Sequence, residues 1–125
     1  MAFEIDSNYT LKIRKGTSGT ISIEELPTNF VGYTARLVVK KTPTTPDTSG
    51  IIIKTTTIAS DYTCVFALTE SDTDVFIIGN DEDFATYKWG IKAISPDGTV
   101  AENIVPVEFN EIPDCLAYPE IGGSN

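Results

Sequence analysis

The chain contains no histidine. Without an imidazole it cannot build Ser-His or Cys-His nucleophile pairs, histidine-containing zinc sites, or the usual general base near neutral pH. A phosphate-binding loop is missing as well. Gly16 and Gly19 follow a predicted strand, but no Gly-Lys-Ser or Gly-Lys-Thr continuation is present and another strand comes next. We therefore expect a protein that is not an enzyme and that binds no cofactor.

Basic residues are scarce. Nine Lys and Arg stand against eighteen Asp and Glu, which gives a formal net charge of −9. Such a surface repels phosphate backbones, so we expect no nucleic-acid partner. No run approaches the roughly 18 consecutive apolar residues of a membrane helix. Residues 1–10 also have neither the basic nor the apolar region of a signal peptide. We expect no membrane association, and synthesis in a bacterial cytoplasm.

Cysteine is scarce too, with only Cys64 and Cys115. Cys64 lies on an alternating run and is expected to face the core as a small apolar residue. Cys115 falls in NEIPDCLAYPEIGG, which looks irregular. Neither has a neighbouring cysteine or histidine at metal-ligand spacing, so no metal site is expected there. A reducing compartment favours two free thiols over a disulfide between them.

What the chain does contain is a hydrophobic period of two. Its 125 residues, 41% of them hydrophobic, suffice for one globular domain with a core. Short runs rich in Val, Ile, Thr and Tyr alternate as half-buried strands do; they are residues 9–13, 20–23, 33–40, 62–69 and 86–93, with a shorter apolar run at 51–55 near a sheet edge. About seven strands and one helical connection predict an all-β, immunoglobulin-like antiparallel β-sandwich.

The most regular stretch is TYKWGIKAISPDGTVAENIVPVEF, residues 86–109, which predicts a hairpin. One parity is apolar and is expected to face the core, at positions 87, 89, 91 and 93. Residues 95–98, Ser-Pro-Asp-Gly, favour a type I turn with a positive φ at the glycine. The apolar parity changes after the turn, which predicts a β-bulge near residues 102–104. Pro106 then belongs beside that bulge or on an edge strand.

Residues 69–79 favour a short helix. Thr69 can cap the free amides, acidic residues fill the first turn, and Gly79 stands just past the expected end. The segment leaves room for about two turns.

The aromatic residues divide into core and surface groups. The spacing of Asp83, Ala85 and Tyr87 is that of an immunoglobulin tyrosine corner, with Trp89 where the second core cysteine would stand. An ordinary core role for Tyr87 remains the alternative. Five aromatics on apolar parities are expected in the core: Tyr9, Tyr33, Tyr62, Tyr87 and Trp89. Three others are expected at the surface: Phe30, Phe84 and Tyr118.

The acidic run after the predicted helix offers hard oxygen ligands for Ca²⁺ at Asp81, Glu82 and Asp83. It lacks the spacing of an EF-hand loop, so we favour a solvated loop and predict no metal.

The strand pattern fades near residue 113. We predict a β-sandwich domain over residues 1–112 and a C-terminal tail or assembly arm over residues 113–125. The apolar residues expected to contact a neighbouring subunit are Ile112, Leu116, Tyr118 and Ile121.

The order of these features resembles a known family. LKIRKGTSGTISI leads into YTARLVVKK, and FALTESDTDVF leads into YKWGIKAISPDGTV. Over residues 9–110 the chain is similar to the immunoglobulin-like β-sandwich at the N-terminus of baseplate upper proteins and related tail-fibre or receptor-binding assemblies in phages of Gram-positive bacteria. The resemblance rests on two motifs, Ile13-Arg14-Lys15-Gly16 and the strand from Tyr87 to Ile91 with the Asp-Gly turn that follows it. Gly90 departs from the family, which has an acidic residue there.

This resemblance implies a non-enzymatic virion structural protein, either a baseplate or tail subunit or a head accessory subunit. It would assemble with other virion proteins or with itself as a homo-oligomer, through sheet edges and the C-terminal arm. Its location would be the virion. The alternative is a carbohydrate-binding module, with Ca²⁺ held by the acidic run.

Overall fold

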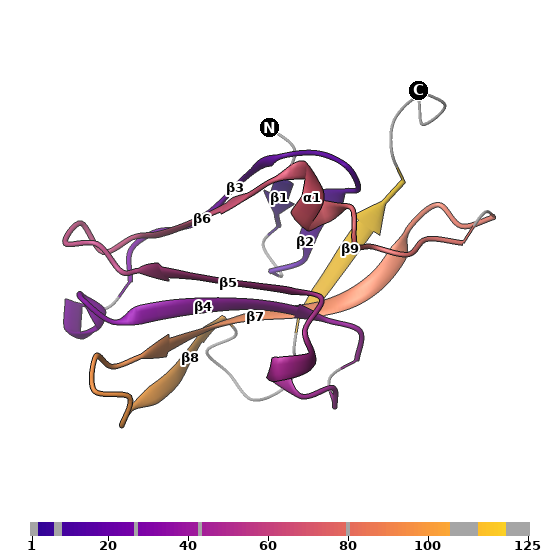
Figure 1. Ribbon diagram of the computed structural model, residues 1–125. Helices are drawn as coiled ribbons and strands as arrows, with labels where there is room; N and C mark the ends of the chain where they lie inside the picture. Colours follow the sequence, from indigo (N-terminus) through magenta and orange to yellow (C-terminus); the bar gives the residue numbers. More distant parts are fainter. Residues whose placement is uncertain are drawn as a thin grey trace.

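The computed structural model describes residues 3–6, 9–26, 28–42, 44–79, 81–105 and 113–119. Within these residues the chain is built of strands, one α-helical turn and two 3₁₀ turns (Figure 1). The strands are β1 (Phe3–Ile5), β2 (Leu11–Arg14), β3 (Gly19–Ile23), β4 (Thr34–Lys40), β5 (Ile52–Thr57), β6 (Cys64–Leu68), β7 (Ala85–Ile94), β8 (Ala101–Val105) and β9 (Asp114–Tyr118). The helical turns are η1 (Thr28–Phe30), η2 (Asp47–Ser49) and α1 (Glu70–Thr73). No helix in this part of the chain is long and apolar enough to cross a bilayer.

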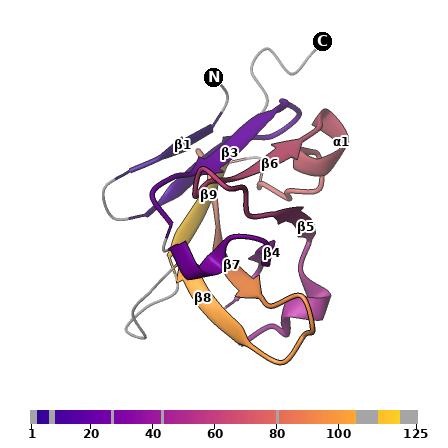
Figure 2. The same ribbon diagram turned by 90° about the vertical axis from the view of Figure 1, so that its left-hand side faces the viewer.

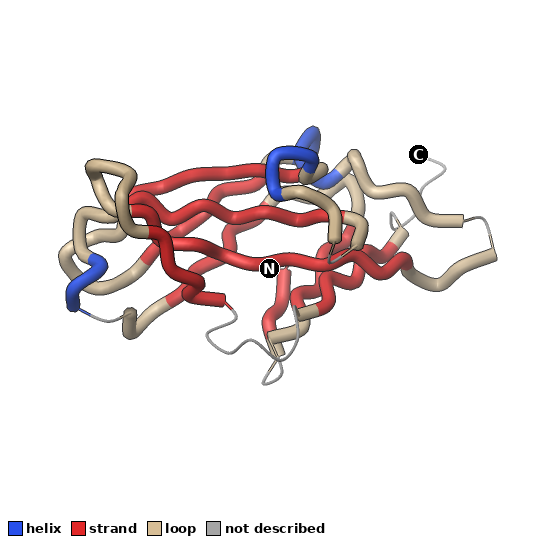
Figure 3. The backbone as a smooth tube through the Cα atoms, turned by 90° about the horizontal axis from the view of Figure 1, so that it is seen from below, coloured by secondary structure: helices blue, strands red, loops and turns tan. Residues whose placement is uncertain are grey.

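The strands form two layers. The larger sheet has the order β1-β2-β9-β7-β4-β5, with β8 also paired to β7. The smaller sheet, β3 with β6, crosses above it in Figure 1. Figure 2 shows the larger sheet curling, which brings β1 beside β3 and β5 beside β6. Figure 3 shows the helical turns at the periphery of this strand framework. The predicted all-β sandwich-like class is confirmed.

The details differ from the expected antiparallel seven-stranded sandwich. Nine strands are present in the described residues, and one pairing, β2 with β9, is parallel. The shorter run at 51–55 becomes β5, which ends the path of the larger sheet as predicted.

β7 is the central strand, and its burial follows the predicted alternation. Every second side chain faces the core between the two sheets: Ala85, Tyr87, Trp89, Ile91 and Ala93. One side of the strand pairs with β4, and the other pairs with β9 and then β8. β7 thus pairs with three strands, and its inward residues belong to the hydrophobic core.

The hairpin after β7 forms as predicted. The Gly98 amide donates to the Ser95 carbonyl at 2.9 Å, and Gly98 has a φ of 78°. In β8, Asn103 opposes Lys92 and Val105 opposes Ile91, so Ile104 is the additional residue of a bulge. The hydroxyl of Ser95, followed by the amide and hydroxyl of Thr99, lowers the pKa of Asp97 to about 2.

The predicted tail is wrong for residues 114–118, which form β9. This strand lies between β2 and β7, and Cys115 and Ala117 are fully buried in the core. The strand is only five residues long and is flanked by Pro113 and Pro119. Local alternation over so short a run is weak, whereas two neighbouring strands satisfy its backbone groups.

Three aromatic residues lie elsewhere than predicted. Tyr9 and Tyr62, expected in the core, are 52% and 40% exposed, while Phe30 is buried. Both tyrosines have positive φ values, 63° and 67°, which end the strand alternation there. The Tyr9 carbonyl accepts the indole N–H of Trp89 at 2.8 Å. Tyr9 therefore contributes its backbone to the core and leaves its ring outside.

The predicted two-turn helix is a single turn. Thr69 caps it through a capping box with Asp72, as its sequence indicates. The turn ends at Thr73. Beyond it, the Lys15 ammonium donates to the carbonyls of Asp74 and Phe76 at 2.8 and 2.6 Å. Phe76 is then fully buried. Gly79 lies beyond, in a loop, and is not the helix C′ residue.

Trp89→Phe should lower the free energy of unfolding by about 2 to 4 kcal/mol. The substitution removes buried ring volume and leaves the Tyr9 carbonyl without its donor. Urea denaturation followed by circular dichroism measures the change, since the variant has no tryptophan fluorescence. Tyr9→Asn is the control: it keeps the carbonyl and tolerates the positive φ, so stability should stay within about 1 kcal/mol of the wild type. Equal losses in both variants would contradict the assignment.

Candidate interaction surface

The outer face of β9 carries two of the four predicted contact residues. Leu116 and Tyr118 are half-buried on the face opposite to Cys115 and Ala117. Ile112 and Ile121 lie outside the described residues. The register places Lys12 beside Leu116 and Arg14 beside Tyr118. Leu116 and Tyr118 thus lie in a sheet face and not on a free arm.

An aromatic and basic row crosses this face. The rings of Tyr118 and Phe84 lie 5.7 Å apart at 44°, and Phe84 is 41% exposed. The Arg14 guanidinium lies 5.7 Å from the centre of the Tyr118 ring and donates to the Pro119 carbonyl at 2.7 Å. A cation over an aromatic face and a tilted ring pair are both favourable arrangements. We name Lys12, Arg14, Leu116 and Tyr118 the β9 surface, which Phe84 borders through its contact with Tyr118.

The larger sheet concentrates positive charge on its outer face. Six of the nine basic residues lie on outward positions of β2, β4 and β7: Lys12, Arg14, Arg36, Lys40, Lys88 and Lys92. One acidic residue of β9, Asp114, joins them and pairs with Lys88 at 2.5 Å. Glu4 of β1 lies opposite Lys12 in the register and is exposed on the same face. This face therefore carries +4 (six minus two), and the rest of the chain carries −13 to give the net −9. The basic residues already stand at the polar, outward positions of the strands in the sequence. The sequence reasoning above missed this separation of charge.

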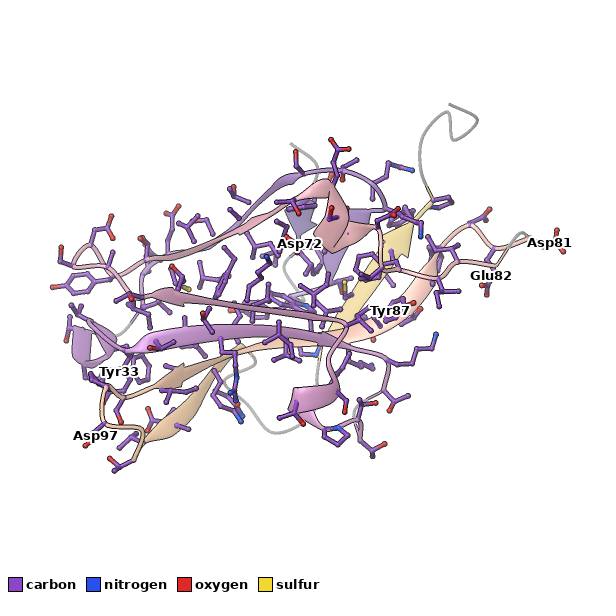
Figure 4. The ribbon with its side chains drawn as sticks, in the orientation of Figure 1. Tyr33, Asp72, Asp81, Glu82, Tyr87 and Asp97 are labelled. Carbon is purple, nitrogen blue, oxygen red and sulfur yellow. The ribbon has the colours of Figure 1, made fainter. Side chains whose placement is uncertain are left out.

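A loop extends beyond the end of the sandwich opposite to the β7–β8 turn. It leaves the core at Phe76 and returns at the start of β7, with Asp81 and Glu82 at its far end (Figure 4). Glu82 accepts the Gly79 amide at 2.9 Å, and the Glu82 amide donates to the Gly79 carbonyl at 3.0 Å. We name residues 77–84 the finger, of which residue 80 is not described.

Asp81, Glu82 and Asp83 are all exposed in the finger. In the described part of the chain, no three Asp, Glu, Cys or His side chains come together as metal ligands. One Glu82 oxygen is also engaged with the loop backbone. The arrangement is that of an exposed acidic turn.

The hydroxyl of Tyr87 holds the base of the finger. It accepts the Ile77 amide at 2.9 Å and donates to the Ile77 carbonyl at 3.3 Å. This link resembles the predicted tyrosine corner, although it reaches ten residues back. The ring of Phe76 packs edge-on against Tyr87 at 5.0 Å. Phe76 is buried, and the backbone of Ile77 is hydrogen-bonded to the Tyr87 hydroxyl. The Ile77 side chain therefore points outward and is 79% exposed.

Sequence reasoning missed Ile77 and its neighbour Val75, which is 41% exposed. Both stand in an apolar run, DVFIIG, that we read as the end of a helix. Burial alternates from Val75 to Ile78, and these residues lie beyond the end of α1. The signal that could have revealed it is the run's length, because one helical turn cannot use four adjacent apolar residues.

Both cysteines are free and buried. Burial raises the pKa of Cys64 to about 11, with a smaller opposing hydrogen bond from Ile23. Burial also raises the pKa of Cys115, and the neighbouring Asp114 adds to the shift. Neither thiol is a nucleophile at neutral pH.

No protein family and no curated protein sequence matches this chain. Among solved structures, the chain is similar to the PmoD soluble domain from Methylocystis sp. ATCC 49242 (Rockwell), with a TM-score of 0.46. The sequence identity is 11%, and the match covers 87% of this chain and 77% of the other. So distant a similarity carries no inference about function.

Asp72 links α1 to β5 and should make stability depend on pH. The Thr69 amide, and then the hydrogen bond and charge of Lys54 at 3.0 Å, lower the pKa of Asp72 from 3.8. A lowered folded-state pKa means that the stabilisation is complete above pH 3.8 and is lost as the pH falls through the folded-state value. Asp72→Ala should therefore cost about 1 kcal/mol at pH 7 and progressively less in acid.

Urea denaturation of the wild type and the variant between neutral and strongly acidic pH measures this difference. Glu24→Ala, at an exposed position that follows β3, is the control and should stay within about 0.5 kcal/mol of the wild type. A cost of Asp72→Ala that does not change with pH would refute the role given to its charge.

Proposed function

We propose that this protein is a non-enzymatic structural subunit of a bacteriophage or prophage virion, in the baseplate, the tail or as a head accessory protein. It assembles with other virion proteins or with itself. The placement in a virion rests on the resemblance of the strand and turn motifs at residues 13–16 and 87–98 to the N-terminal domain of baseplate upper proteins. The assembly role rests on the β9 surface, where Leu116 and Tyr118 lie exposed in part beside basic side chains.

A β9 surface of this composition suits protein contact. Aromatic and arginine residues are enriched where proteins meet, because they bury large areas and still offer polar groups. Tyr118, Phe84 and Arg14 already hold one another in place. A surface ordered in advance loses less side-chain entropy when a partner binds.

A sheet edge offers a second route of assembly. In the described residues, β8 pairs only with β7, so its other edge carries backbone groups that a neighbouring strand could join. The bulge at Ile104 and the exposed Glu102 restrict that pairing, as edge strands of native proteins usually do. The edge therefore permits a specific partner and disfavours open-ended aggregation.

Mass spectrometry of purified particles should find this chain at a fixed ratio to the other virion proteins. The double variant Leu116→Ala and Tyr118→Ala should reduce incorporation about tenfold or more, since it removes two contact side chains. Val65→Ala, an exposed residue of the smaller sheet, is the matched control and should incorporate normally. Absence of the wild-type chain from particles would reject the proposal.

The ring pair of Phe84 and Tyr118 also favours one alternative, a carbohydrate-binding module. Sugar CH groups pack on exposed aromatic faces, and the finger could supply Ca²⁺ ligands. In that case a glycan array should show binding that is lost in Phe84→Ala, and a chelator should abolish any Ca²⁺-dependent part. An array without binding would remove this alternative.

A further inference from the structure

The finger and the β9 surface carry opposite charges, and each also presents apolar side chains. The finger presents Asp81, Glu82 and Asp83 together with the exposed Ile77. The β9 surface presents Lys12 and Arg14 together with Leu116 and Tyr118. The finger is acidic and apolar. The β9 surface is apolar with two basic side chains, of which Lys12 lies opposite Glu4 of β1.

The finger is held in place for contact. The two hydrogen bonds of the Tyr87 hydroxyl fix the backbone of Ile77, and the two bonds between Gly79 and Glu82 close the turn. An apolar side chain that is 79% exposed on a backbone fixed in this way adds no stability to the isolated chain. Buried against a partner, it would remove apolar area from water at little entropic cost.

The two elements lie side by side on one molecule. Phe84 ends the finger and contacts Tyr118 of the β9 surface, and both elements lie at the same end of the sandwich (Figures 1 and 4). A two-fold axis near Phe84 would place each finger on the β9 surface of the other copy. Such an interface uses the same patch on both subunits, as two-fold dimers do.

We infer that the partner of this end of the molecule is a second copy of the chain, with the finger of each copy docked on the β9 surface of the other. The acidic tip meets Lys12 and Arg14, and Ile77 packs beside Leu116 and Tyr118. This inference deepens the proposed assembly function and rests on it. Two reciprocal contacts also double the area that a single finger would bury, toward the roughly 1,200 Å² of a stable interface.

Sedimentation velocity of the full chain, from micromolar to millimolar concentration, tests the dimer. The wild type should dimerise, and salt should weaken the dimer because its charged contacts lie near solvent. Ile77→Asp should raise the dissociation constant about tenfold or more. Val65→Asp, at an exposed apolar residue of the smaller sheet, is the control and should not change it.

Charge reversal identifies the two contacting elements. The finger variant Asp81→Lys with Asp83→Lys, and the surface variant Lys12→Glu with Arg14→Glu, should each stay monomeric. An equimolar mixture of the two should restore a heterodimer of wild-type affinity, because each contact again joins opposite charges. Lys12→Glu alone replaces the surface double variant if circular dichroism shows that the Arg14 change disturbs folding.

Three results would overturn the inference: a monomeric wild type, a dimer insensitive to both reversals, or a mixture that fails to associate. Binding of a poly-glutamate peptide by a monomeric wild type would assign the β9 surface to another acidic partner, which also overturns it. If the chain is found in particles but does not self-associate, only the dimer inference is rejected. Absence from particles removes the proposed function, whatever sedimentation shows.

Discussion

The hydrogen bond from the indole of Trp89 to the carbonyl of Tyr9 organises this molecule. Trp89 is fully buried in the middle of β7, so its N–H must find an acceptor inside the protein. The acceptor comes from a residue eighty positions earlier, and Tyr9 adopts a positive φ to supply it. This bond links the residues just before β2 to the middle of β7, across the intervening strand β9.

The same strand sets the position of the finger. Tyr87 lies two residues before Trp89 on the inward face of β7, and its hydroxyl also bonds to the backbone of a distant segment, at Ile77. Two buried aromatic residues therefore satisfy their polar atoms with main-chain groups from outside the strand. Core packing and the presentation of an exposed apolar side chain follow from one requirement, that buried donors and acceptors be paired.

In the proposed dimer, electrostatics favours one relative orientation of the two copies. A chain of net charge −9 repels its own copies at long range. The Debye length at physiological salt is about 8 Å, so that repulsion is screened beyond the nearest charges. Contacts between the basic outer face and an acidic segment act within this distance. In the proposed dimer, segregated charge selects the orientation in which the two copies meet, while the net charge opposes other encounters.

Local hydrophobic periodicity predicted much of the fold. Alternation predicted the inward face of β7, and the change of parity predicted the bulge at Ile104, because side-chain direction in a strand depends only on neighbouring residues. The same local reasoning misplaced Tyr9 and Tyr62, and it read Cys115 to Tyr118 as a tail. These residues adopt their conformations through partners far along the chain. The sequence alone determined which side chains could be buried; the tertiary structure decided which strands meet and what they leave exposed, since pairing depends on long-range register.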